Sequence, residues 1–158
     1  MGVRIIFLDI DGVLNYGGCP DRAPSHCMGI ANEKLLLLKQ IVDATNAKIV
    51  LVSTWKHIWE KHDKIAMDDD AIYMDEKFEE CGLSIYDKTY DRGFNRGYGI
   101  MEYINRTDDV IDSWIVIDDE VFADYQIYNI FPNLIKTLFD GGIEEYHVKI
   151  AIEKLLTS

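Results

Sequence analysis

The sequence has little cysteine, little proline and a shortage of positive charge. Its three cysteines, Cys19, Cys27 and Cys81, are an odd number without CxxC spacing, so neither a disulfide framework nor a zinc site is indicated. Lys and Arg number 16 against 28 Asp and Glu, which gives a formal charge of −12. Because phosphate contacts come mainly from Lys and Arg, this balance argues against a broad nucleic-acid-binding surface, although a short strand end can still reach a local basic spot.

Long apolar runs are also missing. No run approaches the roughly 20 residues that span a bilayer, and Asp9 interrupts the first apolar run before it could serve as a signal peptide. Ile6 stands where a myristoylation signal has Ser or Thr. We therefore expect a cytoplasmic protein without a membrane partner. With 158 residues, 3 prolines and no low-complexity tract, the chain is expected to form one globular domain over residues 1–158.

Short apolar segments alternate with helical patterns along the chain. We expect strands over residues 3–8, 48–52, 114–117 and 134–138, with residues 83–91 as a further candidate. We expect helices over residues 33–44, 55–66, 76–81, 99–106 and 144–156, with Asn32 as the N-cap of the first and Gly82 at the end of the third. Continuous apolar strands between helices predict an α/β fold with a parallel sheet covered on both faces. Ligands then bind at the carboxyl ends of the strands.

Polar side chains follow three of these strands. They are Asp9 and Asp11, then Ser53 and Thr54, then Asp118 and Asp119. Because the carboxyl ends of parallel strands share one edge, we expect four carboxylates to converge there. Carboxylates crowded together repel one another unless a cation lies among them, and oxygen ligands select a hard ion. The sequence therefore predicts a Mg²⁺ site.

These motifs resemble those of the haloacid dehalogenase (HAD) superfamily, most of whose members are Mg²⁺-dependent phosphatases. "DIDGV" with Asp9 and Asp11 resembles motif one, "IVLVST" with Ser53 resembles motif two, and "IVIDDE" with Asp118 and Asp119 resembles motif four. The resemblance implies a HAD-like Rossmannoid fold of three layers. The insertions are too short for a large cap domain.

Motif three of the superfamily needs a Lys or Arg. Arg96, in "NRGYGIMEYI", is our choice, and Arg92 is the alternative. More narrowly, "STW", "VIDDE" and the closing "DGGIEEYHVKIAIEKLL" resemble the small HAD domains associated with RNA-repair proteins. That resemblance implies a nucleic-acid end as substrate and an RNA-repair protein as a partner.

The resemblance also assigns roles to the residues. Asp9 would be the nucleophile that forms an aspartyl-phosphate, and Asp11 the acid and base. Ser53, the amide of Thr54 and Arg96 would bind the phosphoryl group. Asp9, the backbone carbonyl of Asp11, Asp118 and Asp119 would hold the metal, and which of the last two touches it stays open.

Two residues near motif one have other roles. Gly12 lets the chain turn away from the crowded site without a Cβ. Asn15 either contacts substrate or holds the turn. Trp55 closely follows motif two and is able to line the site.

Two alternatives compete with a phosphatase for nucleic-acid ends. One is a phosphatase for a small phosphorylated metabolite or a mononucleotide. The other is a non-catalytic binding module that keeps the fold. Against the second stands the complete set of motif residues, which a degenerate copy would lose in part.

Overall fold

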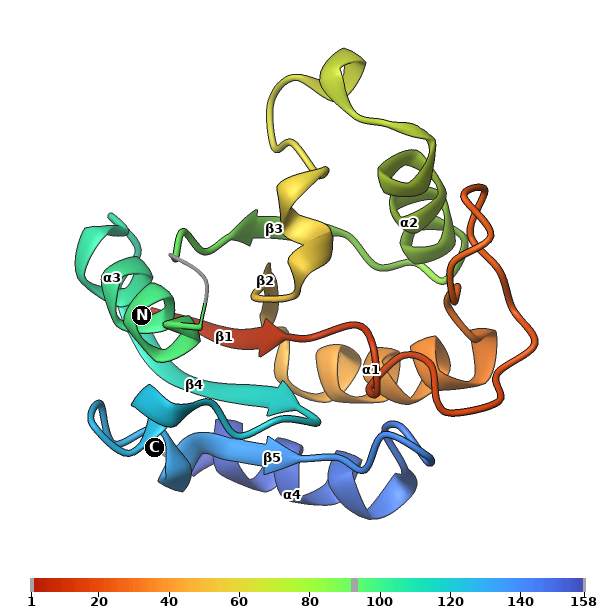
Figure 1. Cartoon of the computed structure of the whole chain (residues 1–158). Helices are drawn as coiled ribbons and strands as arrows, with labels where there is room; N and C mark the ends of the chain where they lie inside the picture. Colours follow the sequence, from red (N-terminus) through yellow and green to blue (C-terminus); the bar gives the residue numbers. More distant parts are fainter. Residues whose placement is uncertain (1, 92–93, 158) are drawn as a thin grey trace.

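A computed structural model describes residues 2–91 and 94–157 of the chain (Figure 1). Five parallel strands form one sheet in the order β3-β2-β1-β4-β5. The strands are β1 Val3–Leu8, β2 Lys48–Leu51, β3 Ile85–Lys88, β4 Ile111–Asp118 and β5 Leu134–Lys136. The predicted parallel α/β fold is confirmed, and the candidate segment 83–91 does contain a strand.

Helices cover both faces of the sheet (Figure 1). They are α1 Asn32–Thr45, α2 Asp69–Glu80, α3 Arg96–Arg106 and α4 Glu145–Leu156. Short 3-10 turns lie between them: η1 Thr54–His57, η2 Lys64–Ala66, η3 Ala123–Tyr125 and η4 Phe131–Asn133. The described residues contain no large cap domain, and none of their helices is long and apolar enough to cross a membrane.

The central strand β1 explains how the two faces are filled. Ile6 and Leu8 pack into a core shared with α1, α2 and α4, whereas Ile5 and Phe7 pack into a second core with α3. The Phe7 ring meets the Tyr103 ring of α3 edge-on, with centroids 5.7 Å apart. Because successive side chains of a strand point to opposite faces, a strand buried on both sides must be apolar throughout.

The helix expected over residues 55–66 is wrong. Only the turns η1 and η2 form there, and the chain between them is irregular. Lys56 is buried, and its ammonium group is paired with Asp91 rather than facing solvent as the polar side of an amphipathic helix would. The Asp63 carboxylate accepts a hydrogen bond from the backbone of Ala66, a local bond that competes with helix formation.

Two helix starts also differ from the prediction. Ala31, not Asn32, is the N-cap of α1, because the Asn32 side chain accepts a hydrogen bond from Lys77 instead. Helix α2 begins at Asp69 rather than at residue 76. The Asp68 carboxylate caps it by accepting from the Ala71 amide, and Asp69 and Asp70 form its acidic first turn.

Helix α3 begins at Arg96 rather than at residue 99, and the reason lies in a distant part of the chain. The Asp124 carboxylate of η3 accepts hydrogen bonds from the amides of Gly97 and Tyr98, at 3.0 and 2.8 Å. A carboxylate at this end of a helix satisfies free N–H groups and complements the helix dipole. The bonds therefore fix Arg96 at the first turn of α3.

Candidate active site

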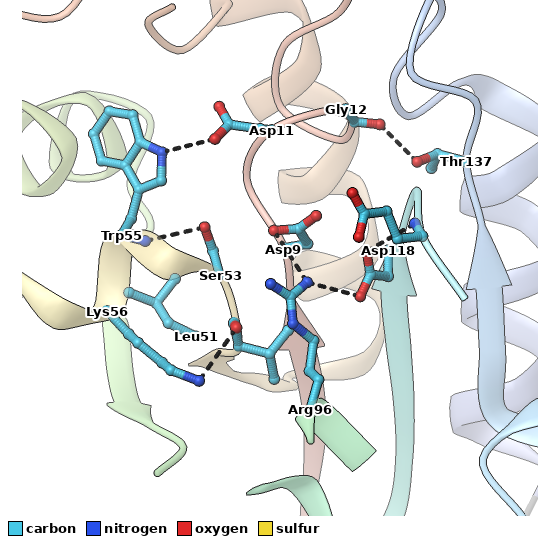
Figure 2. A network of polar contacts seen from close by, with 12 residues as sticks. Asp9, Asp11, Gly12, Leu51, Ser53, Trp55, Lys56, Arg96, Asp118 and Thr137 are labelled. Atoms are coloured by element: carbon cyan, nitrogen blue, oxygen red, sulfur yellow. Dashed lines mark hydrogen bonds and ion pairs between the residues drawn. The ribbon is translucent and has the colours of Figure 1, made fainter. Parts of the chain in front are cut away.

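The motif residues gather at the carboxyl edge of the sheet (Figure 2). Asp9 follows β1, Ser53 lies just beyond the end of β2, and Asp118 is the last residue of β4. Arg96 reaches this edge from the first turn of α3. Since β1 pairs with both β2 and β4, the strand ends that carry these side chains are neighbours.

Three carboxylates form an acidic cluster at this edge. Asp9, Asp118 and Asp119 each offer an oxygen, and the three oxygens lie within 4.8 Å of one another. Burial, and next the charge of Asp118, raise the pKa of Asp9 well above its ordinary value. Burial also raises the pKa of Asp119. Crowded oxygen ligands whose ionisation is costly fit a hard divalent cation such as Mg²⁺.

Arg96 joins two members of the cluster. Its Nη1 donates to Asp118 Oδ2 at 2.9 Å and lies 3.5 Å from Asp9 Oδ1. Its guanidinium also lies over the Phe122 ring, 4.2 Å from the centroid. This is where the sequence placed the motif-three cation. Arg92, the alternative, lies outside the described residues.

Asp118 and Asp119 have different surroundings. Asp118 is fully buried, and its oxygens accept from Arg96, from the Tyr125 hydroxyl at 2.8 Å and from the Glu120 amide at 3.0 Å. Asp119 is only partly buried and lines the pocket in front of Asp9. Asp119 is therefore the member of the pair whose carboxylate faces the open side of the site.

The side chain of Asp11 does not join the cluster, so the expected convergence of four carboxylates is wrong. The chain leaves β1 in a turn, and Figure 2 shows the Asp11 carboxylate directed toward Trp55, away from Asp118. It accepts a hydrogen bond from Trp55 Nε1 at 3.3 Å (Figure 2). It accepts a second from Asn15 Nδ2 at 2.8 Å. The two aspartates of motif one are therefore held in different environments.

Gly12 and Asn15 shape the turn after motif one. Gly12 has a φ of +79°, and a Cβ there would overlap the Asp119 carboxylate. Asn15 is fully buried: its Oδ1 accepts from the Gly12 amide at 2.8 Å, and its Nδ2 donates to Asp11 and to the Gly29 carbonyl. Asn15 thus holds the turn. The substrate contact also expected for it does not fit this burial.

Ser53 and Thr54 differ in exposure. Ser53 is buried, and its hydroxyl accepts from the Trp55 amide at 3.2 Å as the N-cap of η1. Thr54 is exposed and lines the pocket that contains Asp9 and Arg96. Trp55 lies at the site, as its position after motif two suggested.

Sequence reasoning missed a buried ion pair behind motif two. Lys56 Nζ lies 2.8 Å from Asp91 Oδ2, with both side chains buried, and 3.2 Å from Thr89 Oγ1. Burial lowers the pKa of Lys56, against the raising effect of Asp91. The position of Lys56 directly after "STW" is the one signal in the sequence, and the partner Asp91 cannot be read from it.

Two adjoining pockets open at this edge. The first, of about 320 Å³, contains Asp9, Arg96 and Asp119. The second, of about 470 Å³, contains Trp55 and Ile58, and we call it the Trp55 pocket. Asp11, Thr54 and Phe139 line both.

Comparison with known proteins agrees with the motif assignment. Residues 5–148 match the model of a family described as the HAD domain in Swiss Army Knife RNA repair proteins. No curated protein matches the chain. The chain also resembles a solved structure of a Legionella pneumophila protein assigned to subfamily III A of the HAD superfamily of hydrolases. The two sequences are 14% identical, and the structures superpose with a TM-score of 0.46 over 97% of this chain and 85% of that one. The family match spans most of the sequence, so the chain belongs to the HAD domains of Swiss Army Knife RNA repair proteins.

Proposed function

We propose that this domain is a Mg²⁺-dependent phosphomonoester hydrolase that works through an aspartyl-phosphate. The observation that carries the proposal is the separation of the two motif-one carboxylates. Asp9 lies in the acidic cluster next to Arg96, whereas Asp11 is held outside it by Trp55 and Asn15. Such a pair suits a nucleophile and a proton-transfer group acting on opposite sides of one phosphorus atom.

The binding of the phosphoryl group is assigned to Arg96, the Ser53 hydroxyl and the amide of Thr54. These groups supply positive charge and hydrogen-bond donors on the side of Asp9. Asp9, Asp118 and Asp119 would hold Mg²⁺, which supplies charge neutralisation for the phosphoryl oxygens. Arg96 keeps Asp9 and Asp118 in place through its two contacts.

The reaction proceeds in two displacements. A carboxylate oxygen of Asp9 attacks phosphorus and the P–O bond to the alcohol breaks, while protonated Asp11 gives its proton to the leaving oxygen. Asp11, now a carboxylate, then takes a proton from water as that water attacks the same phosphorus. The bond to Asp9 breaks, phosphate leaves, and both aspartates return to their starting forms.

The proposed substrate is the phosphorylated end of a nucleic acid. The family description, with its reference to RNA repair, and the absence of a large cap domain among the described residues support an accessible, bulky substrate. An RNA-repair protein would then be the partner. The acidic balance of the chain favours the main alternative, a mononucleotide or small metabolite.

Hydrolysis of a generic aryl phosphate tests the activity before any choice of substrate. We expect turnover with Mg²⁺, loss of it with chelator, and loss of at least about a thousandfold in Asp9→Asn. Turnover that needs no metal, or that survives in Asp9→Asn, contradicts the mechanism. Oligonucleotides with a 3′- or a 5′-phosphate, compared with free nucleotides, then identify the substrate.

A further inference from the structure

We propose that the Trp55 pocket binds the nucleoside of the alcohol that leaves during hydrolysis. This inference rests on the proposed function and adds a substrate class to it. The chemical group recognised is a flat, weakly polar ring attached to a sugar that carries one terminal phosphate. A small aliphatic phosphate ester would leave this pocket empty.

The position of Asp11 carries the first step of the argument. Asp11 is the group that protonates the leaving oxygen, so the rest of the alcohol must lie on the side of Asp11. Asp11 lines both pockets, as do Thr54 and Phe139, and the Trp55 pocket is the space that continues from it. An alcohol bonded to a phosphorus atom beside Asp9 therefore extends into this pocket.

The walls of the pocket are suited to a ring. Trp55, Ile58, Met28 and Phe139 give it a mainly apolar lining, and its volume of about 470 Å³ is in the range of small-molecule sites. Trp55 is held in one orientation by its Nε1 bond to Asp11, and Phe139 is 45% exposed. A nucleobase that stacks on an aromatic side chain gains roughly tenfold in affinity or more.

The charge of the pocket limits what else the substrate carries. Asp70 lies on its wall and is fixed by hydrogen bonds from the Ser25 amide at 3.0 Å and the Ser25 hydroxyl at 2.5 Å. Asp68 and Asp69 adjoin it in the chain. A carboxylate here repels a second phosphate and is able to accept a hydrogen bond from a sugar hydroxyl or a base amino group.

The test compares two esters in variants of Met28, a half-buried residue of the pocket wall to which the proposed mechanism gives no role. Met28→Trp fills the pocket, and Met28→Glu adds a charge without adding bulk, so one variant serves if the other fails to fold. Val110→Trp is the control, because Val110 is exposed and lies just before β4, at the amino ends of the strands and away from the candidate site. The substrates are a nucleoside monophosphate and glycerol phosphate.

We expect the wild type to prefer the nucleotide by roughly tenfold or more in kcat/KM. Both Met28 variants should lose that preference and keep the turnover of glycerol phosphate, while the control keeps both. Equal turnover of the two esters by the wild type overturns the inference and leaves the hydrolase proposal standing. The inference is also overturned if a Met28 variant slows the turnover of both esters by the same factor, or if it slows the turnover of neither ester.

Two further experiments change the charge at residue 70 and the length of the substrate. Asp70→Asn should raise the turnover of a nucleoside bisphosphate relative to the monophosphate by roughly two- to fivefold, and an unchanged ratio contradicts the role given to Asp70. A phosphorylated dinucleotide and a free mononucleotide present the same terminal ring. Faster turnover of the dinucleotide assigns the pocket to nucleic-acid ends, and faster turnover of the mononucleotide assigns it to free nucleotides.

Cys27 provides a readout that does not depend on activity. Its thiol is exposed on the pocket wall, whereas Cys19 is buried. In a Cys81→Ser background, nucleoside monophosphate should slow alkylation of Cys27, and Met28→Trp should remove this protection. If neither the aryl phosphate nor either ester is hydrolysed, the hydrolase proposal fails, and the alkylation then decides the inference: protection supports the nucleoside site, and its absence overturns it.

Discussion

At the scale of single residues, Gly12 occupies a position that a side chain cannot share with Asp119. Its φ of +79° lies in the left-handed region, and a Cβ would overlap the Asp119 carboxylate. Gly18 has a similar φ of +82°, with nothing within 4 Å of the Cβ position. Comparing substitutions at the two glycines therefore distinguishes the effect of backbone strain from the effect of moving Asp119.

Replacing each glycine with alanine measures this difference. Both Gly12→Ala and Gly18→Ala should lower the free energy of unfolding by about 1 kcal/mol or more through backbone strain. Gly12→Ala alone should also lower kcat of the proposed hydrolysis by roughly a hundredfold, because it moves Asp119. Urea unfolding and steady-state kinetics check these results. Equal activity of the two variants would show that the position of Asp119 does not matter.

Single residues also show what the sequence reveals about a site. The sequence predicts the positions of Asp9, Ser53 and Asp118 at the strand ends, because the apolar runs show where the strands end and the alternation with helices indicates a parallel sheet. The sequence does not predict the direction of the Asp11 side chain, since that direction depends on the geometry of the turn that includes Asn15 and on Trp55, which reaches Asp11 from beyond β2. Pairings between distant side chains are a property of packing and leave no pattern in the local sequence.

At the scale of elements, the Lys56–Asp91 pair ties η1 to the chain that precedes α3. Both side chains are almost completely buried, and their charged atoms lie 2.8 Å apart. The pair thus connects the segment that begins beside Ser53 to the segment that leads to Arg96. Removing one partner leaves the other charge buried without compensation.

A double-mutant cycle tests this connection. Lys56→Met alone should lower the free energy of unfolding by about 3 to 5 kcal/mol, because Asp91 then remains buried and charged. The double variant with Asp91→Asn should cost less than the sum of the two single variants. Denaturant unfolding of the four proteins gives the coupling. Additive effects would mean that the two side chains do not stabilise each other.

The start of α4 predicts a dependence of stability on pH. His147 is buried, and its Nδ1 accepts a hydrogen bond from the Glu144 amide at 2.9 Å, as part of a capping box. Burial lowers the pKa of His147 below its usual 6.5. The unfolded chain therefore binds a proton before the folded one does as the pH falls.

The free energy of unfolding should thus fall as the pH drops through about 6.5, and level off below the lower pKa of the folded state. Above that window His147 is neutral in both states and has no effect. Urea unfolding at about pH 8 and about pH 5.5 should show a smaller loss in His147→Asn than in the wild type. If both proteins lose the same unfolding free energy between these pH values, titratable groups other than His147 cause the pH dependence.

Elements differ in how well the sequence predicts them. The apolar runs of β1 and β2 gave their positions to within a residue, since burial on both faces imposes one kind of side chain. The helix predicted over residues 55–66 does not form. The burial of Lys56 and the capping role of Asp63 are not visible in the spacing of apolar residues from which that helix was predicted. The start of α3 likewise depends on Asp124, far along the chain.

At the scale of the whole molecule, a chain with a formal charge of −12 concentrates three carboxylates, two of them buried and one partly buried, in one cluster. Their mutual repulsion destabilises the folded state wherever no cation shares them. A ligand that binds only the folded state stabilises it. The proposed Mg²⁺ site should therefore be visible in stability as well as in activity.

Thermal unfolding with and without Mg²⁺ measures this effect. At about ten times its dissociation constant, Mg²⁺ should add about 1.4 kcal/mol and raise Tm by about 3 to 6 °C. Asp119→Asn should melt higher than the wild type without metal, because repulsion is relieved, and should shift less when Mg²⁺ is added. A Tm that does not respond to Mg²⁺ in the wild type would contradict a metal site in this cluster.

The most direct test of the central claim is chemical trapping of phosphate on Asp9. The protein is quenched during turnover of an aryl phosphate with Mg²⁺ and treated with borohydride, which reduces an aspartyl-phosphate to homoserine. We predict homoserine at position 9 in peptide maps, none without Mg²⁺ and none in Asp9→Asn. Steady turnover with an unmodified Asp9, or with the modification at another aspartate, would contradict the assignment of Asp9 as the nucleophile.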